Sequence, residues 1–164
     1  MDAIAEDLIA RLGLQPHPEE GGWFAETYRA GAVDTPAGPR AVATQIYYLL
    51  TPETMSAMHK VAHDEMFHFY LGDAVEQLRL FSDGRSEWVI LGQDVPGGQA
   101  VQSLVPAGVW QGARLLPGGR FALMGCTVAP GFDFADYEHG ARDRLIARWP
   151  AAAAGITALT RDSR

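Results

Sequence analysis

A histidine and a glutamate placed just before an apolar run are the residues of this chain best suited to chemistry. The stretch from His59 to Glu65 leads into the run Met66 to Leu71, and Gly72 follows. An imidazole titrates near neutral pH, and a carboxyl in an apolar environment holds its proton more tightly. Such a pair can move a proton on a ligand, and the same groups also occur as metal ligands. The spacing therefore predicts a polar site centred on His59 and Glu65.

Short apolar runs separated by turn residues must position this site, and they are typical of β-strands. The first strand is expected around Trp23, Phe24 and Tyr28. Seven further runs cover Ala41 to Leu50, Glu65 to Leu71, Val75 to Phe81, Glu87 to Leu91, Gln102 to Val105, Gly108 to Leu116 and Phe121 to Val128. Seven or eight strands with short connections indicate a sandwich, a jelly roll or a barrel.

Helices are expected only near the two ends. Ile4, Leu8, Ile9 and Leu12 have helical spacing, and Gly13 follows as a C-cap. A closing helix is predicted over Ala141 to Trp149, and Pro150 should end it, with Ala151 to Ala154 as a connection to a C-terminal tail. The length of 164 residues favours a single domain over residues 1–164.

Composition narrows the class of protein. Apolar residues make up 48% and charged residues 20%, as in globular proteins, and no run approaches the ~20 apolar residues of a membrane span. The acidic N-terminus lacks the basic start of a secretory signal, so a cytoplasmic location is expected. The net charge of −7, with scattered Lys and Arg, argues against nucleic acid as a partner. Cys126 is the only cysteine, which excludes an intrachain disulfide and predicts a buried, inert thiol.

Several phrases of the chain resemble one known family. They are His17 to Phe24, Glu26 to Arg29, Thr44 to Leu50, Asp64 to Tyr70, Val105 to Gln111 and Gly125 to Phe132. Over residues 5 to 160 this pattern resembles the cupin-5 family, also called DUF985, of the RmlC-like cupin superfamily. His59, Glu65 and Gly72 match the first cupin motif, in which Val61 replaces the second histidine. Gln111 stands where the second motif has a histidine.

The resemblance implies a mainly β fold, the double-stranded β-helix or cupin jelly-roll barrel, with a short N-terminal helix and a C-terminal helical segment. It also implies a pocket between two sheets and frequent homodimers, so a homodimer is expected here. It implies no reaction, because the superfamily includes epimerases, isomerases, dioxygenases, storage proteins and sugar-binding regulators.

Gln111 is expected to join His59 and Glu65 in a three-point polar cluster, as the residue of its strand that points inward while Trp110 points outward. The same three residues are the candidate metal ligands. A Gln carbonyl is a weak donor to transition metals and Val61 offers none, so no cofactor is certain and only a weakly held divalent metal remains open. His63, in the turn before Glu65, is expected to face solvent.

Four more residues are candidate ligand contacts: Gln45, Tyr47, His68 and Trp23. Tyr47 and Gln45 share one face of a strand, which is expected to line the pocket. Strand alternation from Glu65 places Phe67, Phe69 and Leu71 on the pocket face and His68 on the other. The role of His68 therefore stays open between pocket, interface and core.

Two functions from different classes fit these residues. The first is an enzyme that epimerises or isomerises a small polar, carbohydrate-like metabolite, with His59 and Glu65 as acid and base. The second is a module that binds or senses such a ligand without turning it over. A metal-dependent oxygenase is a further alternative.

Overall fold

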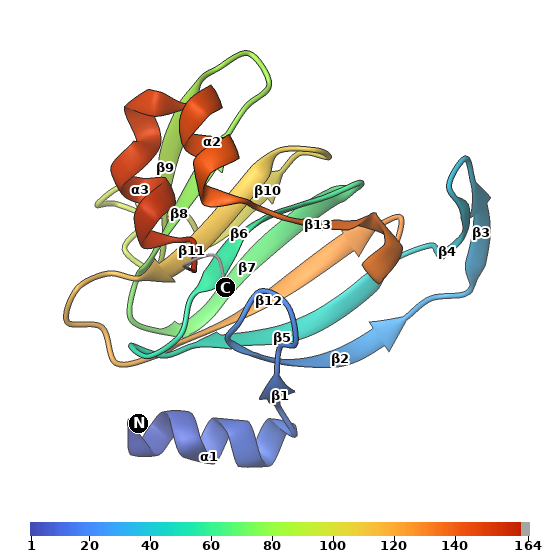
Figure 1. Ribbon diagram of the computed structural model, residues 1–164. Coiled ribbons are helices and arrows are strands. Elements are labelled where there is room, and N and C mark those ends of the chain that lie inside the picture. The colour runs from blue at the N-terminus through green and yellow to red at the C-terminus, as the bar shows by residue number, and fades with distance from the viewer. Residues whose placement is uncertain (162–164) are drawn as a thin grey trace.

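The computed structural model describes residues 1–161, which form two facing antiparallel sheets (Figure 1). The six-stranded sheet has the order β1 (Gln15–Pro16), β2 (Trp23–Arg29), β5 (Thr44–Leu50), β12 (Ala122–Ala129), β7 (Asp64–Gly72) and β10 (Gln102–Val105). The five-stranded sheet has the order β13 (Tyr137–His139), β6 (Ser56–Val61), β11 (Trp110–Leu115), β8 (Val75–Leu80) and β9 (Ser86–Leu91). The mainly β jelly roll predicted from the sequence is confirmed.

The main core lies between the two sheets and follows from strand alternation. Phe67 and Phe69 of β7 are buried there with Met124 of β12 and Tyr48 of β5. Leu71 was predicted on the same face but is 38% exposed. The pairing of β12 with β7 shifts register between Leu123 and Met124, so the alternation is broken before the strand ends.

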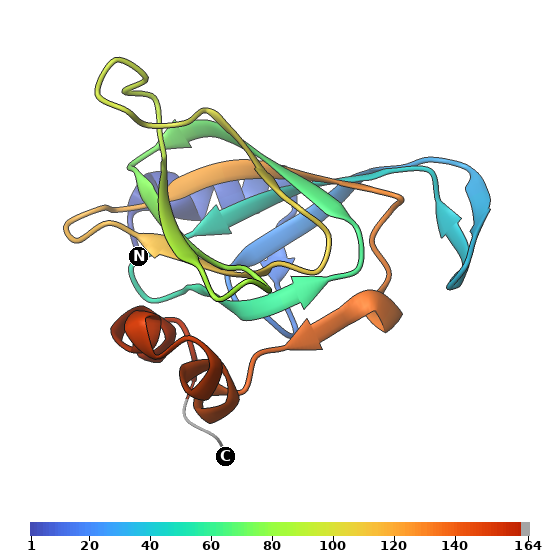
Figure 2. The ribbon, with the colours of Figure 1, turned by 90° about the horizontal axis from the view of Figure 1, so that it is seen from above.

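Two short helices cover the face of the five-stranded sheet that points away from the six-stranded sheet (Figure 2). They are α2 (Arg142–Arg148) and α3 (Ala153–Ala158), and the 3-10 turn η2 (Pro150–Ala152) lies between them. The expected helix before Pro150 is confirmed, but the connection expected at 151–154 is wrong. Alanine has the highest helix propensity, and the segment is held by burial of Ile156 and Leu159 against Met58 and Leu78. The C-terminal tail beyond residue 161 lies outside the described residues.

The N-terminal helix α1 (Ala3–Leu12) covers the outer face of the six-stranded sheet (Figure 1). The Asp2 carboxylate caps it by accepting from the backbone N–H of Ile4, and Gly13 ends it at φ 64°. Leu8, Ile9 and Leu12 pack on the outward side chains of β2 and β5. Strand β5 therefore has apolar side chains on both faces, one packed on α1 and the other in the main core.

A hairpin arm extends away from the barrel (Figures 1 and 2) and consists of β3 (Ala32–Thr35) and β4 (Gly38–Ala41). The strand predicted from residue 41 onward is thus divided, and β5 begins at Thr44. Arg40 of the arm pairs with Asp136, which lies in the turn η1 (Phe134–Asp136), and both side chains are less than 10% exposed. Among residues 1–161, no helix has the length and hydropathy required to cross a membrane.

Candidate functional site

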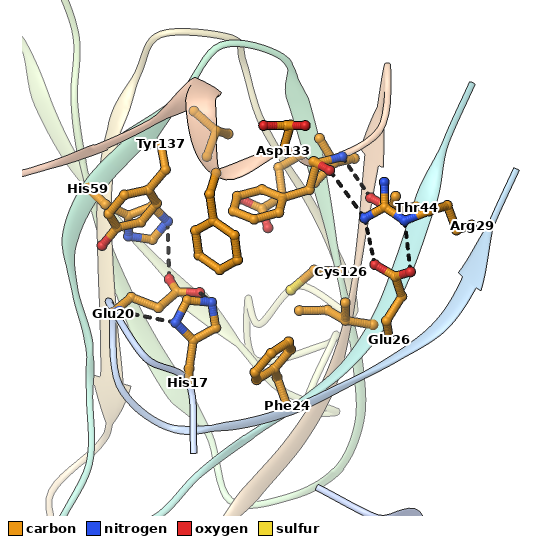
Figure 3. A pocket seen from close by; sticks show the side chains of 16 residues that line it. His17, Glu20, Phe24, Glu26, Arg29, Thr44, His59, Cys126, Asp133 and Tyr137 are labelled. Carbon is orange, nitrogen blue, oxygen red and sulfur yellow. Dashed lines mark hydrogen bonds and ion pairs between the residues drawn. The ribbon is translucent and has the colours of Figure 1, made fainter. Parts of the chain in front are cut away.

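A cavity of about 360 Å³ opens between the two sheets, and its side chains come from both of them (Figure 3). The loop before β2 contributes His17 and Glu20, and β6 contributes His59. Glu65 enters from β7 on the facing sheet. Four titratable side chains from three separate elements of the chain therefore line the same cavity.

Glu20 lies between two histidines (Figure 3). Its Oε1 is 3.3 Å from His17 Nε2, and its Oε2 is 3.1 Å from His59 Nε2. The Ser56 hydroxyl also donates to Oε2, at 2.8 Å. Both carboxylate oxygens of Glu20 are thus engaged by protein groups.

The backbone fixes which nitrogen of each ring carries a proton. His17 Nδ1 accepts from the backbone N–H groups of Glu19 and Glu20, so its proton is on Nε2 and is donated to Glu20. His59 Nδ1 lies 2.7 Å from the Ala57 carbonyl oxygen and must donate to it. A neutral His59 therefore presents a bare Nε2 to Glu20.

The contact between His59 and Glu20 accordingly requires one further proton, carried by either group. Burial raises the pKa of Glu20 and lowers the pKa of His59, although the charge of Glu65 raises the pKa of this histidine. These directions favour a neutral pair with the proton on Glu20. The pair can thus give up or take back a proton at the cavity surface.

Glu65 is a second proton carrier, with only 8% of its surface exposed. Burial is the main cause that raises the pKa of Glu65 to about 7; Glu20 acts in the same direction, whereas His59, Gln111 and Cys126 act in the opposite direction. The amide Nε2 of Gln111 donates to Glu65 Oε2 at 2.6 Å. Glu65 therefore changes protonation state close to neutral pH.

Aromatic rings form much of the remaining wall. Tyr137 stacks on His59 with ring centroids 5.3 Å apart, and Phe24 lies 4.8 Å from the ring of His17. Phe132 and Phe134 meet edge to face with their centroids 5.0 Å apart. This wall suits the flat or C–H face of a small ring compound.

Arg29, Glu26 and Asp133 also line the cavity, away from the histidines (Figure 3). The Arg29 guanidinium donates to both carboxylate oxygens of Glu26, at 2.9 and 2.8 Å, and also to the backbone carbonyl of Phe132. Among residues 1–161, Arg29 is the one arginine of the lining, and it is already paired with a carboxylate.

The structure brings together the three residues predicted as the centre of the site. His59 and Glu65 line the cavity, and Gln111 is bonded to Glu65 with 1% of its surface exposed. Gln111 points inward as predicted, whereas Trp110 packs on the outer face beneath the C-terminal helices. What these residues do with a ligand remains a prediction.

The other four predicted contacts lie outside this cavity. Trp23 and Tyr47 pack beneath α1, and Gln45 bonds to Thr127. The prediction that the face of β5 with Gln45 and Tyr47 lines the pocket was thus wrong. Because α1 covers the outer face of β5, that face is apolar too, and strand alternation alone does not show which face points to the cavity. Ile46 of this strand lines the cavity instead.

His68 bonds to Thr127 at 3.0 Å and to Gln102 at 3.2 Å, and it does not line the cavity. It lies on the face of β7 opposite Glu65, as alternation predicted.

His63 was expected to face solvent, but its side chain is only 18% exposed and its Nε2 lies 3.4 Å from Asp136. The turn η1 covers this histidine.

Sequence reasoning did not assign roles to His17, Glu20 or Tyr137, which complete the site. His17 and Glu20 stand three residues apart within a phrase that the family resemblance singled out. This spacing of three residues could have predicted a contact between the two side chains. Nothing in the sequence, however, places that loop against β6.

The donors present do not fit a transition-metal site of the cupin type. His59, Val61, Glu65 and Gln111 occupy the motif positions, and they offer one histidine. Both nitrogens of His59 are already engaged, by Ala57 and by Glu20. Within residues 1–161, no three His, Cys, Asp or Glu side chains are grouped as metal ligands.

Jelly rolls occur in several classes of protein, and the cupins are one of them. Oxalate decarboxylase from Bacillus subtilis is similar with a TM-score of 0.55 and 15% identity, over 89% of this chain and 37% of that one. This likeness shows the fold alone. The chain belongs to the Cupin_5 family of the cupin superfamily (DUF985), whose model matches residues 6–140.

Three proteins with higher sequence identity are similar to this chain over most of their own length. A hypothetical protein from Leishmania major is 31% identical with a TM-score of 0.89, over 96% of this chain and 99% of that one. Protein SO0799 from Shewanella oneidensis is 33% identical with a TM-score of 0.88, over 97% and 98%. The uncharacterized protein YML079W of Saccharomyces cerevisiae is 31% identical over 80% of this chain and 73% of the yeast protein.

Proposed function

We propose that this protein is an acid–base enzyme that epimerises or isomerises a small, uncharged, carbohydrate-like carbonyl compound. The observation that carries the proposal is Glu65, a buried carboxyl at the cavity whose pKa is raised to about 7. A general base works best when its pKa lies near the working pH. The proton-sharing pair of Glu20 and His59 supplies the complementary acid.

The proton transfers balance within these groups. Glu65 takes a proton from the carbon next to the substrate carbonyl, and the C–H electron pair forms the double bond of an enediol. The Glu20–His59 pair donates a proton to the carbonyl oxygen. For an isomerisation, Glu65 delivers its proton to the former carbonyl carbon, and the Glu20–His59 pair takes the O–H proton from the neighbouring carbon, which becomes the new carbonyl. For an epimerisation, the original carbon receives a proton on its opposite face, and the Glu20–His59 pair takes back the proton that it gave to the carbonyl oxygen.

Charge favours a neutral substrate. Glu20, Glu26, Glu65 and Asp133 all line the cavity, whereas Arg29, the one arginine that the described part of the chain contributes, is already bonded to Glu26. A phosphate or carboxylate group would find no unpaired Lys or Arg among the described residues of the lining. The aromatic wall suits the C–H face of a sugar-like ring.

The test has two stages. Small neutral aldoses, ketoses and related carbonyl compounds are first screened for those that raise the melting temperature. Each stabilising compound is then incubated with the protein in D₂O, and loss of the proton next to the carbonyl is followed by ¹H NMR. Glu65→Gln should slow this exchange by about 10²-fold or more. Glu138→Gln, which removes an exposed carboxylate on β13, is the matched control and should exchange at the wild-type rate.

A second function, binding without turnover, is favoured by one observation. The polar groups at the end of the cavity bond to one another, with Glu20 held by two histidines and Glu65 held by Gln111. Such a network can recognise a ligand without changing it. A stabilising compound recovered chemically unchanged and free of deuterium would refute the enzyme and support the binding module.

A further inference from the structure

A chain of buried polar side chains continues from Glu65 into the barrel interior, away from the cavity. Gln77 is fully buried, Gln111 is 1% exposed and Arg79 is 6% exposed. All three belong to the five-stranded sheet, on the adjacent strands β8 and β11. Glu65 belongs to the facing sheet, so the chain links the two sheets through the core.

Each link in this chain is a hydrogen bond. Gln111 Nε2 donates to Glu65 Oε2 at 2.6 Å, and Gln77 Nε2 donates to Gln111 Oε1 at 3.4 Å. Arg79 then donates to Gln77 Oε1 from Nε at 3.1 Å and from Nη2 at 2.9 Å. The chain thus runs without interruption from a guanidinium to the carboxyl of the proposed base.

Arg79 is itself held at the far end of the chain. Its Nη2 also donates to the Ser103 hydroxyl on β10, and its Nη1 lies 3.5 Å from a carboxylate oxygen of Glu87 on β9. Glu87 reaches solvent, with 43% of its side chain exposed. The guanidinium therefore has partners in both sheets and keeps one position.

The arginine dictates the direction of every bond in the chain. A guanidinium has donors only, so Gln77 must turn its carbonyl oxygen toward Arg79. The amide nitrogen of Gln77 then faces Gln111, which must accept with its own carbonyl oxygen. Gln111 is left with its amide nitrogen toward Glu65. Without the arginine, either amide could turn over and present oxygen where it now presents nitrogen.

We propose that Arg79 is a positioning residue that acts through Gln77 and Gln111 to keep an N–H donor on the carboxyl of Glu65. This rests on the proposed function, because Glu65 is the base in that reaction. A donor bond stabilises the ionised carboxylate, which is the form that accepts a proton from the substrate. A flipped Gln111 would offer an acceptor and favour the protonated acid instead.

The experiment measures the protonation of Glu65 in the ligand-free protein, by NMR titration of its ¹³C-labelled carboxyl. Gln77→Met breaks the chain at its centre, keeps the charge of Arg79 and nearly keeps the side-chain volume. The Glu65 titration midpoint should rise by about one pH unit in this variant, the shift expected for loss of one charge-assisted donor. Glu20, His59 and Cys126, which also face Glu65, are unchanged.

Substitutions of Arg79 test whether its hydrogen-bond donors, and not only its packing, set the direction of the bonds that lead to Glu65. Arg79→Met should raise the midpoint in the same way, and Arg79→Lys, which restores a donor-only cation, should return it toward the wild-type value. Arg114→Met is the matched control, because Arg114 lies on β11 but bonds outward to Glu76. It should leave the midpoint unchanged.

A folded Gln77→Met protein with the wild-type midpoint would overturn the proposal, even if Arg79→Met shifted it, because the arginine would then act only through its charge. Folding of each variant is checked by its amide NMR spectrum. No substrate or turnover enters the measurement. Failure of the proposed enzyme activity would therefore leave this result standing, and failure here would leave the exchange assay interpretable.

Discussion

Glu65 should make the folded protein less stable as the pH rises from about 4.5 to above 7. Burial holds the folded pKa near 7, against an ordinary value of 4.5. Between these values the unfolded chain has released the proton and the folded chain still holds it, so raising the pH favours unfolding. The contribution of Glu65 is complete below pH 4.5 and is lost as the pH rises through 7.

The magnitude follows from the difference of about 2.5 pH units. At about 1.4 kcal/mol for each unit, ionisation of Glu65 should lower the free energy of unfolding by about 3 kcal/mol. Burial also raises the pKa of Glu20, which adds to the trend, and lowers the pKa of His17 and His59, which opposes it. The comparison of wild type with Glu65→Gln isolates the one group.

The assay is urea unfolding followed by tryptophan fluorescence at a series of pH values from 4.5 to 8. The stability of Glu65→Gln relative to wild type should improve with pH by about 3 kcal/mol across this range. Glu138→Gln, with a side chain 59% exposed in the wild type, should change the free energy of unfolding by less than about 1 kcal/mol throughout. A difference between Glu65→Gln and wild type that is flat, or that falls with pH, would refute the reasoning.

Two further predictions concern how the walls of the cavity are held. Asp136→Asn should lower the midpoint of urea unfolding, because the part-buried guanidinium of Arg40 then lacks its ionic partner; an unchanged midpoint would contradict a contribution of this pair to stability. Gly72→Ala should lower the melting temperature much more than Gly84→Ala, because both glycines have positive φ but only at Gly72 does the new Cβ meet a backbone carbonyl, that of Phe121. Equal losses in the two alanine variants would show that this close approach carries no cost.

The regular elements were largely predictable because their signals are local. Alternating apolar runs placed β7, β8, β9, β10, β11 and β12 nearly residue for residue, and spacing with a glycine cap placed α1. The predicted elements did not include β1, β3, β4, β6 or β13, and α3 was predicted as a connection. The arm β3–β4 packs little on the core, and β13 is a three-residue strand held by its pairing with β6.

Some residues of the site were predictable from the sequence, and others were not. His59, Glu65 and Gln111 could be found because they lie at fixed spacings within motifs. His17 and Glu20 lie in a loop whose position depends on contacts with β6, so their meeting with His59 could not be read from spacing.

The sequence by itself determined the β-rich jelly roll, the capped N-terminal helix, the cupin-5 resemblance and the polar centre of the cavity. Each of these depends on residues close together in the chain or on a repeated pattern. Only the tertiary structure decided that Glu20 contacts His59, that Tyr47 packs beneath α1 outside the cavity, and that Arg79 connects to Glu65 through two glutamines. These depend on packing between strands distant in sequence, where burial raises the pKa of a carboxyl and a donor-only side chain sets the direction of its neighbours' bonds.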